Sequence, residues 1–317
     1  MKNKTALIFG ISGQDGAYLS QLLINKGYIV WGTSRDAKKS KFTNLESLGI
    51  DKKINLVTIL DDDFQKLLNL ISKSLPDEIY YLAGQSSVGL SFQEPKETIY
   101  SNVLGILNVL EVCRLIDKEI RVYYAGSSEC FGDTGDLPAT EDTPFHPQSP
   151  YAVSKTSAFW LVDNYRNAYN LFICFGILFN HESPFRSQKF VTQKIISTAR
   201  RISQGSRDKL ELGRLDISRD WGWAPEYVEA MWLMLQQDIP EDFVIATGET
   251  NSLEQFVEET FNQLSLNWQN YIEINEEFIR PYEITMSRAD PSKAMQKLNW
   301  KAKYKMREVI KMMLKLL

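Results

Sequence analysis

TALIFGISGQDG, residues 5–16, joins a short apolar run to three glycines spaced G-x-x-G-x-x-G. The apolar run predicts a buried strand, and AYLSQLLINKG (17–27) predicts the helix that follows it. Gly10 permits a sharp turn, Gly13 lets the backbone approach a pyrophosphate, and Gly16 allows tight packing of helix on strand. The pyrophosphate would lie against free N–H groups at the helix start. By itself such a pattern is also common in tight turns, but in this strand–turn–helix context it predicts a dinucleotide site.

Short apolar runs and helical patterns continue to alternate along the first half of the chain. The runs are apolar throughout rather than at every second residue, which is typical of parallel strands covered on both faces. They lie at residues 28–34, 55–60, 78–84, 121–128 and 172–180. This alternation predicts an α/β fold with a doubly wound, mostly parallel sheet of the Rossmann type. A helix at 225–237 and a strand at 243–248 are expected to return to that sheet.

The pattern becomes irregular after about residue 180, which suggests a second, smaller α/β lobe. We expect residues 1–180 plus about 223–248 to form the Rossmann domain. The lobe would then comprise about 181–222 plus 249–317.

The composition excludes several classes of protein. The chain has 317 residues, 44% of them hydrophobic and 24% charged, and its net charge of −4 offers no broad basic surface for nucleic acid or for an anionic membrane. No apolar run is long enough to span a bilayer, and the one near the start is too short for a signal peptide. Three cysteines and two histidines show neither a disulfide framework nor metal-ligand spacing. We therefore expect no metal site and a cytoplasmic location, where thiols stay reduced.

The end of the second predicted strand, WGTSRDAKK (31–39), bears on the choice of cofactor. An acidic residue at this place usually binds the ribose 2′-hydroxyl of NAD, and an arginine the 2′-phosphate of NADP. Arg35 and Asp36 are both present, with lysines nearby. We favour NADP over NAD, and the alternative is that Arg35 is a solvated loop charge.

The run at 121–128 ends on Ser127, Ser128 and Glu129, groups that are unfavourable to bury unless something polar meets them. Since ligands of open α/β sheets bind beyond the carboxyl ends of the strands, these side chains predict a site there.

Downstream, SPYAVSK (149–155) predicts a helix start, with Ser149 as the cap and Pro150 in the first turn. Tyr151 and Lys155 are then four residues apart on one helix face. A free tyrosine has a pKa of about 10, so we expect the ammonium and a nicotinamide charge to favour the phenolate and make Tyr151 a proton acceptor. The alternative is an exposed helical pair without catalytic role.

The glycine turn together with YAVSK resembles the extended short-chain dehydrogenases/reductases. Further segments narrow the resemblance to the GDP-mannose 4,6-dehydratase family, over nearly the whole chain. They are GILFNHESP (176–184), FVTQKI (190–195), RDWG (219–222), YVEAMWLMLQ (227–236), DFVIATGE (242–249) and KLNW (297–300). NHESP and RDWG are specific to that part of the superfamily.

The resemblance implies a redox-neutral reaction in which GDP-mannose loses water and becomes GDP-4-keto-6-deoxy-mannose. Tyr151 would take the proton of the sugar 4-hydroxyl while hydride leaves C4 for NADP⁺, with Ser127 bonded to the 4-oxygen. Glu129 would remove the C5 proton, water would leave from C6, and the hydride would return to C6. Lys155 completes the implied catalytic set.

The resemblance also implies binding residues, and a homo-oligomer, either a dimer or a tetramer. Cofactor contacts fall on Gly10, Ser12, Gly13, Gln14, Asp15, Gly16, Arg35, Leu82, Ala83, Gly84, Ser86, Tyr151, Lys155, His181 and Arg186. Nucleotide-sugar contacts fall on Ser86, Ser128, Asn180, Val191, Lys194, Arg219, Arg280 and Glu283. The chain departs from the family at Ser87, where a histidine is usual, and at Glu97, where a tyrosine is more frequent. At the place of the family's adenine-binding aspartate this chain has Leu60, and the adjacent Asp61 is not assigned that role.

Other functions remain open at this point. One is a reductase acting on the 4-keto-6-deoxy product, and another is a dehydratase of a different nucleotide sugar, such as a GDP-heptose. A third is a catalytically silent NADP sensor or scaffold, because a fold alone does not secure activity. NADPH consumption separates the first from a dehydratase, since only the reductase uses it up.

Overall fold

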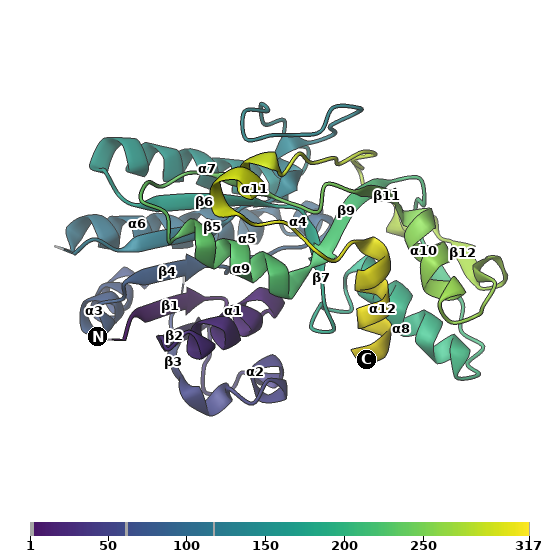
Figure 1. The fold of residues 1–317 in the computed structure, drawn as a ribbon, viewed down its shortest axis with the longest axis horizontal. Coiled ribbons are helices and arrows are strands. Elements are labelled where there is room, and N and C mark those ends of the chain that lie inside the picture. The colour runs from purple at the N-terminus through teal and green to yellow at the C-terminus, as the bar shows by residue number, and fades with distance from the viewer. Residues whose placement is uncertain (1–2, 61–62, 117, 317) are drawn as a thin grey trace.

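The computed structural model describes residues 3–60, 63–116 and 118–316, and within them the largest element is a seven-stranded parallel sheet (Figure 1). Its strands, in order across the sheet, are β10 (Phe243–Ile245), β6 (Ile173–Leu178), β5 (Arg121–Ala125), β4 (Glu78–Tyr81), β1 (Thr5–Phe9), β2 (Ile29–Ser34) and β3 (Ile54–Thr58). The strand order reverses between β1 and β4, the switch point of a doubly wound sheet. The predicted Rossmann-type fold is confirmed. Asp61 lies outside the described residues.

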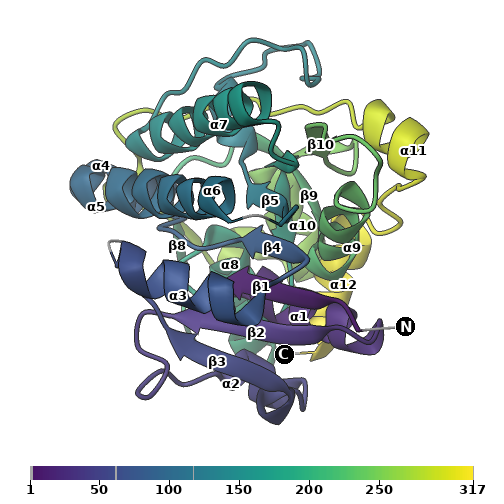
Figure 2. The ribbon, with the colours of Figure 1, turned by 90° about the vertical axis from the view of Figure 1, so that its left-hand side faces the viewer.

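Helices cover both faces of this sheet, so successive strand residues enter different cores (Figure 2). Ile8 and Tyr123 belong to one core, and Leu7 and Tyr124 to the other. The first core is closed by α1 (Gln14–Asn25), α2 (Thr43–Ser47), α9 (Ala224–Met234) and α11 (Ser292–Leu298), and the second by α3 (Phe64–Ser74), α6 (Gly105–Leu115) and α7 (Pro150–Tyr169). As predicted, α9 and β10 return to the main sheet. None of the helices in the described part of the chain has the length and apolarity that a membrane crossing requires.

A broken helical segment precedes α6. It consists of α4 (Val88–Gln93), α5 (Pro95–Ile99) and a π-helical turn at Tyr100–Leu104. Ser87 caps α4 by accepting a hydrogen bond from the Leu90 N–H at 3.3 Å. The residue that departs from the family pattern here therefore has a structural role.

After β6 the chain leaves the main sheet, and the predicted single strand at 172–180 is divided. Asn180–Glu182 form β7, which pairs with β9 (Ser218–Trp223) in a small sheet completed by β11 (Thr250–Ser252). A third core lies around this sheet. The remaining elements of this region are α8 (Val191–Ser203), β8 (Leu210–Leu212), α10 (Leu253–Asn262), β12 (Ile272–Ile274) and α12 (Met306–Leu316).

Two other predicted boundaries shift for local reasons. Helix α1 begins at Gln14 rather than at residue 17, because the turn closes early with Gly13 as its N-cap. The strand predicted at 121–128 ends at Ala125, and Ser127 then caps a 3₁₀ turn at Ser128–Phe131 by accepting from the Glu129 N–H at 3.3 Å.

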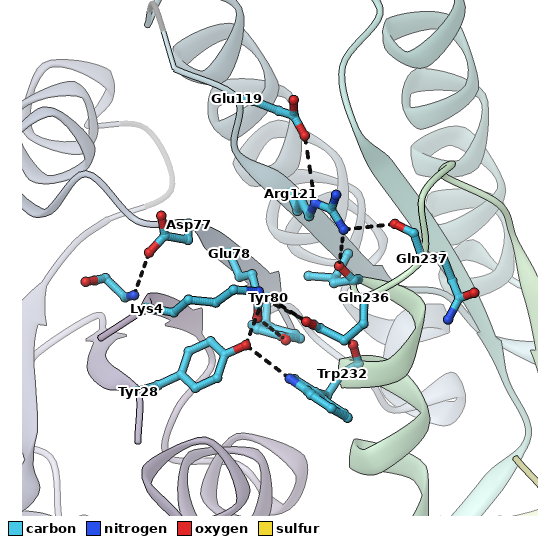
Figure 3. A network of polar contacts seen from close by, with 12 residues as sticks. Lys4, Tyr28, Asp77, Glu78, Tyr80, Glu119, Arg121, Trp232, Gln236 and Gln237 are labelled. Carbon is cyan, nitrogen blue, oxygen red and sulfur yellow. Dashed lines mark hydrogen bonds and ion pairs between the residues drawn. The ribbon is translucent and has the colours of Figure 1, made fainter. Parts of the chain in front are cut away.

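A buried carboxylate joins the strands at the amino end of the sheet, away from the predicted site (Figure 3). Glu78 is 1% exposed and accepts hydrogen bonds from Lys4 Nζ at 3.1 Å, Tyr28 Oη at 2.9 Å and Tyr80 Oη at 2.7 Å. Gln236 Nε2, just beyond α9, donates a fourth at 3.1 Å. This network ties β1, β2, β4 and α9 together.

Candidate active site

A cavity of about 1360 Å³ opens at the carboxyl ends of the main strands and extends to the small sheet. Every residue that the sequence predicts for catalysis, cofactor binding or nucleotide-sugar binding lines it. The structure therefore brings these residues together although they come from segments throughout the chain. Lining residues that the sequence did not single out include Asn44, Arg214 and Phe278, which no local motif marks, and Glu182, which lies within the quoted NHESP segment.

The glycine turn forms one end of the cavity. Gly10 has φ of +81°, and a Cβ on it would lie 2.8 Å from the backbone of Leu82. A Cβ on Gly16 would lie 2.4 Å from the Gly10 carbonyl oxygen. Gly13 caps α1 with extended backbone and has no side chain to bond the first N–H groups of the helix, which belong to residues that line the cavity. These features suit a pyrophosphate at the helix start.

A buried ion pair lies at the start of α1. His181 Nε2 is 3.0 Å from Asp15 Oδ2, and its Nδ1 is 2.7 Å from the Phe179 carbonyl oxygen. Since both partners only accept, both ring nitrogens carry protons. Burial opposes the charged forms, but the attraction within the pair outweighs it, raising the pKa of His181 and lowering that of Asp15. The ring also stacks on Tyr227, with centroids 4.6 Å apart.

Helix α7 presents the predicted base. It begins as expected, with Ser149 accepting from the Ala152 N–H at 3.1 Å and Pro150 in the first turn. Tyr151 is 8% exposed and lines the cavity together with Lys155 and Ser127. Its side chain is close enough to Ser127 for a hydrogen bond that opposes the effect of burial on its pKa.

The predicted lowering of the Tyr151 pKa stays a prediction, because it relies on the Lys155 ammonium together with the positive charge of a nicotinamide. Burial raises the pKa of Tyr151 well above its ordinary value, and the Lys155 ammonium lies 5.9 Å from the centre of the Tyr151 ring. The ammonium instead donates to the Ala125 carbonyl at 2.9 Å and to Tyr124 Oη at 3.2 Å. Burial lowers the pKa of Lys155 to about 8.

Glu129 faces the cavity from the turn after β5, near a cluster of charges. The Glu283 carboxylate accepts from Arg219 Nη2 at 3.3 Å and from Arg280 Nη1 at 3.1 Å. Burial lowers the pKa of the Arg219 guanidinium, and the Glu129 and Glu283 carboxylates oppose that effect. Two guanidinium groups therefore converge on the Glu283 carboxylate, and such groups can also bind an anionic ligand with paired hydrogen bonds.

The far ends of the cavity are more exposed. Arg35 is 78% exposed, and its Nη1 is 3.8 Å from Glu97 Oε1. At the other end Lys194 Nζ lies 3.8 Å from the centre of the Phe278 ring. Both cations are accessible to a ligand that fills the cavity.

Comparison with known proteins finds similarity to one family over nearly the whole chain. A family model described as GDP-mannose 4,6 dehydratase matches residues 7–313. The GDP-mannose 4,6 dehydratase 2 of Arabidopsis thaliana is 46% identical over 98% of this chain and 86% of that protein.

Solved structures with lower identity show the likeness of fold alone. The dTDP-glucose 4,6-dehydratase of Bacillus anthracis in complex with NAD has a TM-score of 0.86 at 19% identity, covering 98% of this chain and 96% of that one. RMD from Pseudomonas aeruginosa complexed with NADPH has a TM-score of 0.80 at 22% identity, covering 99% and 98%.

Proposed function

The chain belongs to the GDP-mannose 4,6-dehydratase family, and from this premise we propose how its residues convert GDP-mannose to GDP-4-keto-6-deoxy-mannose. The enzyme is a hydro-lyase, and the reaction removes one water without net redox change. The observation that carries the proposal is that Glu129 and Tyr151 line one cavity from different elements, together with Ser127 and Lys155. A dehydration needs one proton acceptor for the oxidation and a second for the elimination, and the presence of both side chains in one cavity supports these roles.

A nicotinamide cofactor is part of this family's chemistry, and we propose NADP, with NAD as the less favoured alternative. When bound, it accepts hydride from C4 and returns hydride to C6. The glycine turn and the start of α1 suit its pyrophosphate, and the imidazolium of His181 neutralises Asp15 beside it. Arg35 is exposed and can turn from Glu97 to a 2′-phosphate.

The protein's own groups move the protons. Tyr151 takes the proton of the 4-hydroxyl, and Ser127 donates a hydrogen bond to the 4-oxygen. Because burial raises the pKa of Tyr151, the base form depends on nearby positive charge, which Lys155 and the oxidised nicotinamide provide. The 4-keto group then acidifies C5, where Glu129 removes the proton. The same proton can leave with the C6 hydroxyl as water, so Glu129 is restored.

The nucleotide sugar lies in the part of the cavity lined by the small sheet and α8. We propose residues 1–180 plus about 223–248 as the NADP-binding domain and about 181–222 plus 249–317 as the nucleotide-sugar lobe, with the exception that α11 packs on the core of the main sheet and so belongs with the NADP-binding domain. Arg219 and Arg280 hold the diphosphate, which can compete with their shared carboxylate, Glu283. The remaining contacts to the sugar, ribose and phosphates fall on Ser86, Ser128, Asn180, Val191, Lys194 and Glu283.

We also propose a cytoplasmic homo-oligomer, either a dimer or a tetramer. The cytoplasmic location is supported by Cys113, Cys130 and Cys174, which are all buried free thiols.

One incubation tests the proposed function. Purified protein is mixed with GDP-mannose and a sub-stoichiometric amount of NADP⁺, and the products are identified by mass. A nucleotide sugar lighter by one water, formed over many turnovers without accumulation of NADPH, is the expected result. If GDP-mannose stays intact while a 4-keto-6-deoxy sugar is reduced at the expense of NADPH, the protein is a reductase. Conversion of a GDP-heptose but not of GDP-mannose would change the substrate and keep the chemistry.

A further inference from the structure

Tyr124 is fully buried at the end of β5, outside the lining of the cavity, and its hydroxyl is nevertheless bonded on two sides. Lys155 Nζ donates to Tyr124 Oη at 3.2 Å, and Tyr124 Oη donates to the backbone carbonyl of Asn102 at 2.9 Å. The ammonium also lies 4.7 Å from the centre of the Tyr124 ring. A strand residue with a purely apolar role would need none of these contacts.

The carbonyl that receives the Tyr124 proton belongs to the π-helical turn at Tyr100–Leu104. Such turns interrupt the regular helical ladder and are frequent at functional sites. The side chain of Asn102 donates to the Gln85 and Thr98 carbonyls at 2.9 Å each, and the neighbouring Ser101 Oγ accepts from the Gln85 N–H at 3.2 Å. The side chains of this turn therefore bind the cavity loop at Gln85, and its backbone carbonyl at Asn102 binds Tyr124.

These contacts fix the direction of the hydrogen bond to Lys155. A carbonyl oxygen only accepts, so the Tyr124 proton points to Asn102 and the lone pairs of its oxygen face the ammonium. The ammonium has three protons, and one of the others is bonded to the Ala125 carbonyl at 2.9 Å. With two directions set, the third N–H is left for the cavity, which Lys155 lines.

We propose that Tyr124 is a positioning residue for the reaction: its hydroxyl, oriented by the Asn102 carbonyl, holds the Lys155 ammonium in place and keeps it charged. This inference rests on the proposed function, because Lys155 affects turnover only if Tyr151 is the base. The titratable groups facing Lys155 and Tyr124 are Tyr151 on α7, Cys130 in the turn after β5 and Tyr81 on β4. Burial raises the pKa of Cys130 to about 11, so it remains a neutral thiol near pH 7.

The test compares Tyr124→Phe with Tyr123→Phe. Tyr123 is the adjacent residue, is equally buried, faces the opposite core, and its hydroxyl has no hydrogen-bond partner among the described residues. Loss of the Tyr124 hydroxyl removes one of two acceptors from a buried cation, so the pKa of Lys155 should fall by about one unit, since a hydrogen bond to a charged group is worth about that much. The alkaline limb of the pH profile of kcat should move to lower pH by about the same amount, with KM for GDP-mannose little changed. Tyr123→Phe should leave both the profile and the Lys155 pKa at wild-type values.

Two readouts separate this inference from the proposed function. The pH profile needs turnover, whereas the pKa of Lys155 is measured by NMR of ¹³C-labelled lysine, assigned with Lys155→Met. A wild-type protein that leaves GDP-mannose intact would contradict the proposed function. The Lys155 pKa in wild type and in Tyr124→Phe would still show whether Tyr124 keeps the ammonium charged. An active wild type with an unshifted Lys155 pKa in Tyr124→Phe would overturn the inference. So would a loss of activity that is equal at every pH.

A second measurement covers the case in which Tyr124→Phe does not fold. The protein is labelled with 3-fluorotyrosine and carries Tyr151→Phe, which removes the other tyrosine near Lys155. The labelled tyrosine that bonds to Lys155 is then Tyr124. Its ¹⁹F resonance should follow the titration of Lys155 and lose that step when Lys155→Met is added. If no tyrosine resonance responds to Lys155→Met, the inference is overturned.

Discussion

Replacing Glu129 with Gln should separate oxidation of the sugar from loss of water. The amide keeps the size of the side chain but cannot accept the C5 proton. Oxidation at C4 depends on Tyr151, which comes from a different element and is unchanged in the variant. We therefore expect the reaction to stop after its first step.

The size of the effect follows from the chemistry and the charges around the side chain. Loss of a general base should lower turnover by about 10²–10⁴-fold, which corresponds to roughly 3–5 kcal/mol in the barrier. Binding should not suffer, because the Glu129 carboxylate interacts with the buried Arg219 and Glu283. Removing its negative charge makes that neighbourhood more positive, so KM for the nucleotide diphosphate should stay the same or fall.

Stopped-flow absorbance of NADPH gives the decisive measurement. With Glu129→Gln, enzyme-bound NADP⁺ and excess GDP-mannose, NADPH should appear in an amount close to the enzyme concentration and persist. Tyr151→Phe is the matched control, and it should give neither NADPH nor product. Turnover near the wild-type value in Glu129→Gln would remove this residue from the mechanism. Lost turnover without an NADPH signal would show that the substitution blocks oxidation, which contradicts the assignment of oxidation to Tyr151 and of elimination to Glu129.

Three further outcomes are expected. Arg35→Ala should raise KM for NADP⁺ by roughly five- to tenfold, an effect limited by the exposure of the side chain, and should leave KM for NAD⁺ unchanged. Glu97→Gln removes the ion-pair partner of Arg35 and should therefore lower KM for NADP⁺. Steady-state kinetics of both variants with both cofactors measures these changes. Glu78→Gln should destabilise the protein by about 2 kcal/mol in urea unfolding, because it leaves one of the four buried donors around this side chain without an acceptor. The same variant should have the wild-type kcat, and a changed kcat would show that the two ends of the sheet are coupled. The pKa of His181 in the folded protein is raised above its ordinary value of 6.5, so its contribution to stability is complete below that pH and is lost as pH rises through the folded pKa. His181→Asn should therefore lower the free energy of unfolding most at about pH 6 and less at about pH 9. A loss of stability that does not depend on pH would contradict an ion pair with Asp15.

The main sheet was predictable because its signals are local. The apolar runs and the glycine turn specify strand, turn and helix from neighbouring residues alone, and helices on both faces explain why the strands are apolar throughout. The division of the run at 172–180 was not predictable in this way. Nothing within the run distinguishes β6 from β7, and the change of sheet is set by the pairing of Asn180 with Trp221, which lies far along the chain.

The candidate site was predictable only in part from chemistry at known spacing. Tyr151 and Lys155 follow from a helical spacing and Glu129 from a polar strand end, whereas Arg280 and Glu283 came from the family resemblance. Three features had no sequence signal. Tyr124 is a single aromatic residue in an apolar strand, and the π-turn at Tyr100–Leu104 depends on tertiary contacts. The rise in the pKa of Tyr151 depends on how deeply that side chain is buried.

The main sheet has a buried charge near each end, and the two differ in how completely the protein itself surrounds them with hydrogen-bond partners. Glu78, at the amino end, is surrounded by four donors, so its environment already stabilises the charge and a ligand has nothing to add. Lys155, near the carboxyl end, is held by two neutral oxygens, and burial lowers its pKa to about 8. A buried charge with so few partners is unfavourable unless something else completes its shell. Lys155 lines the cavity, and within the described part of the chain its ammonium donates to these two oxygens alone. A ligand with an acceptor oxygen there would stabilise the ammonium and would in turn be oriented by it.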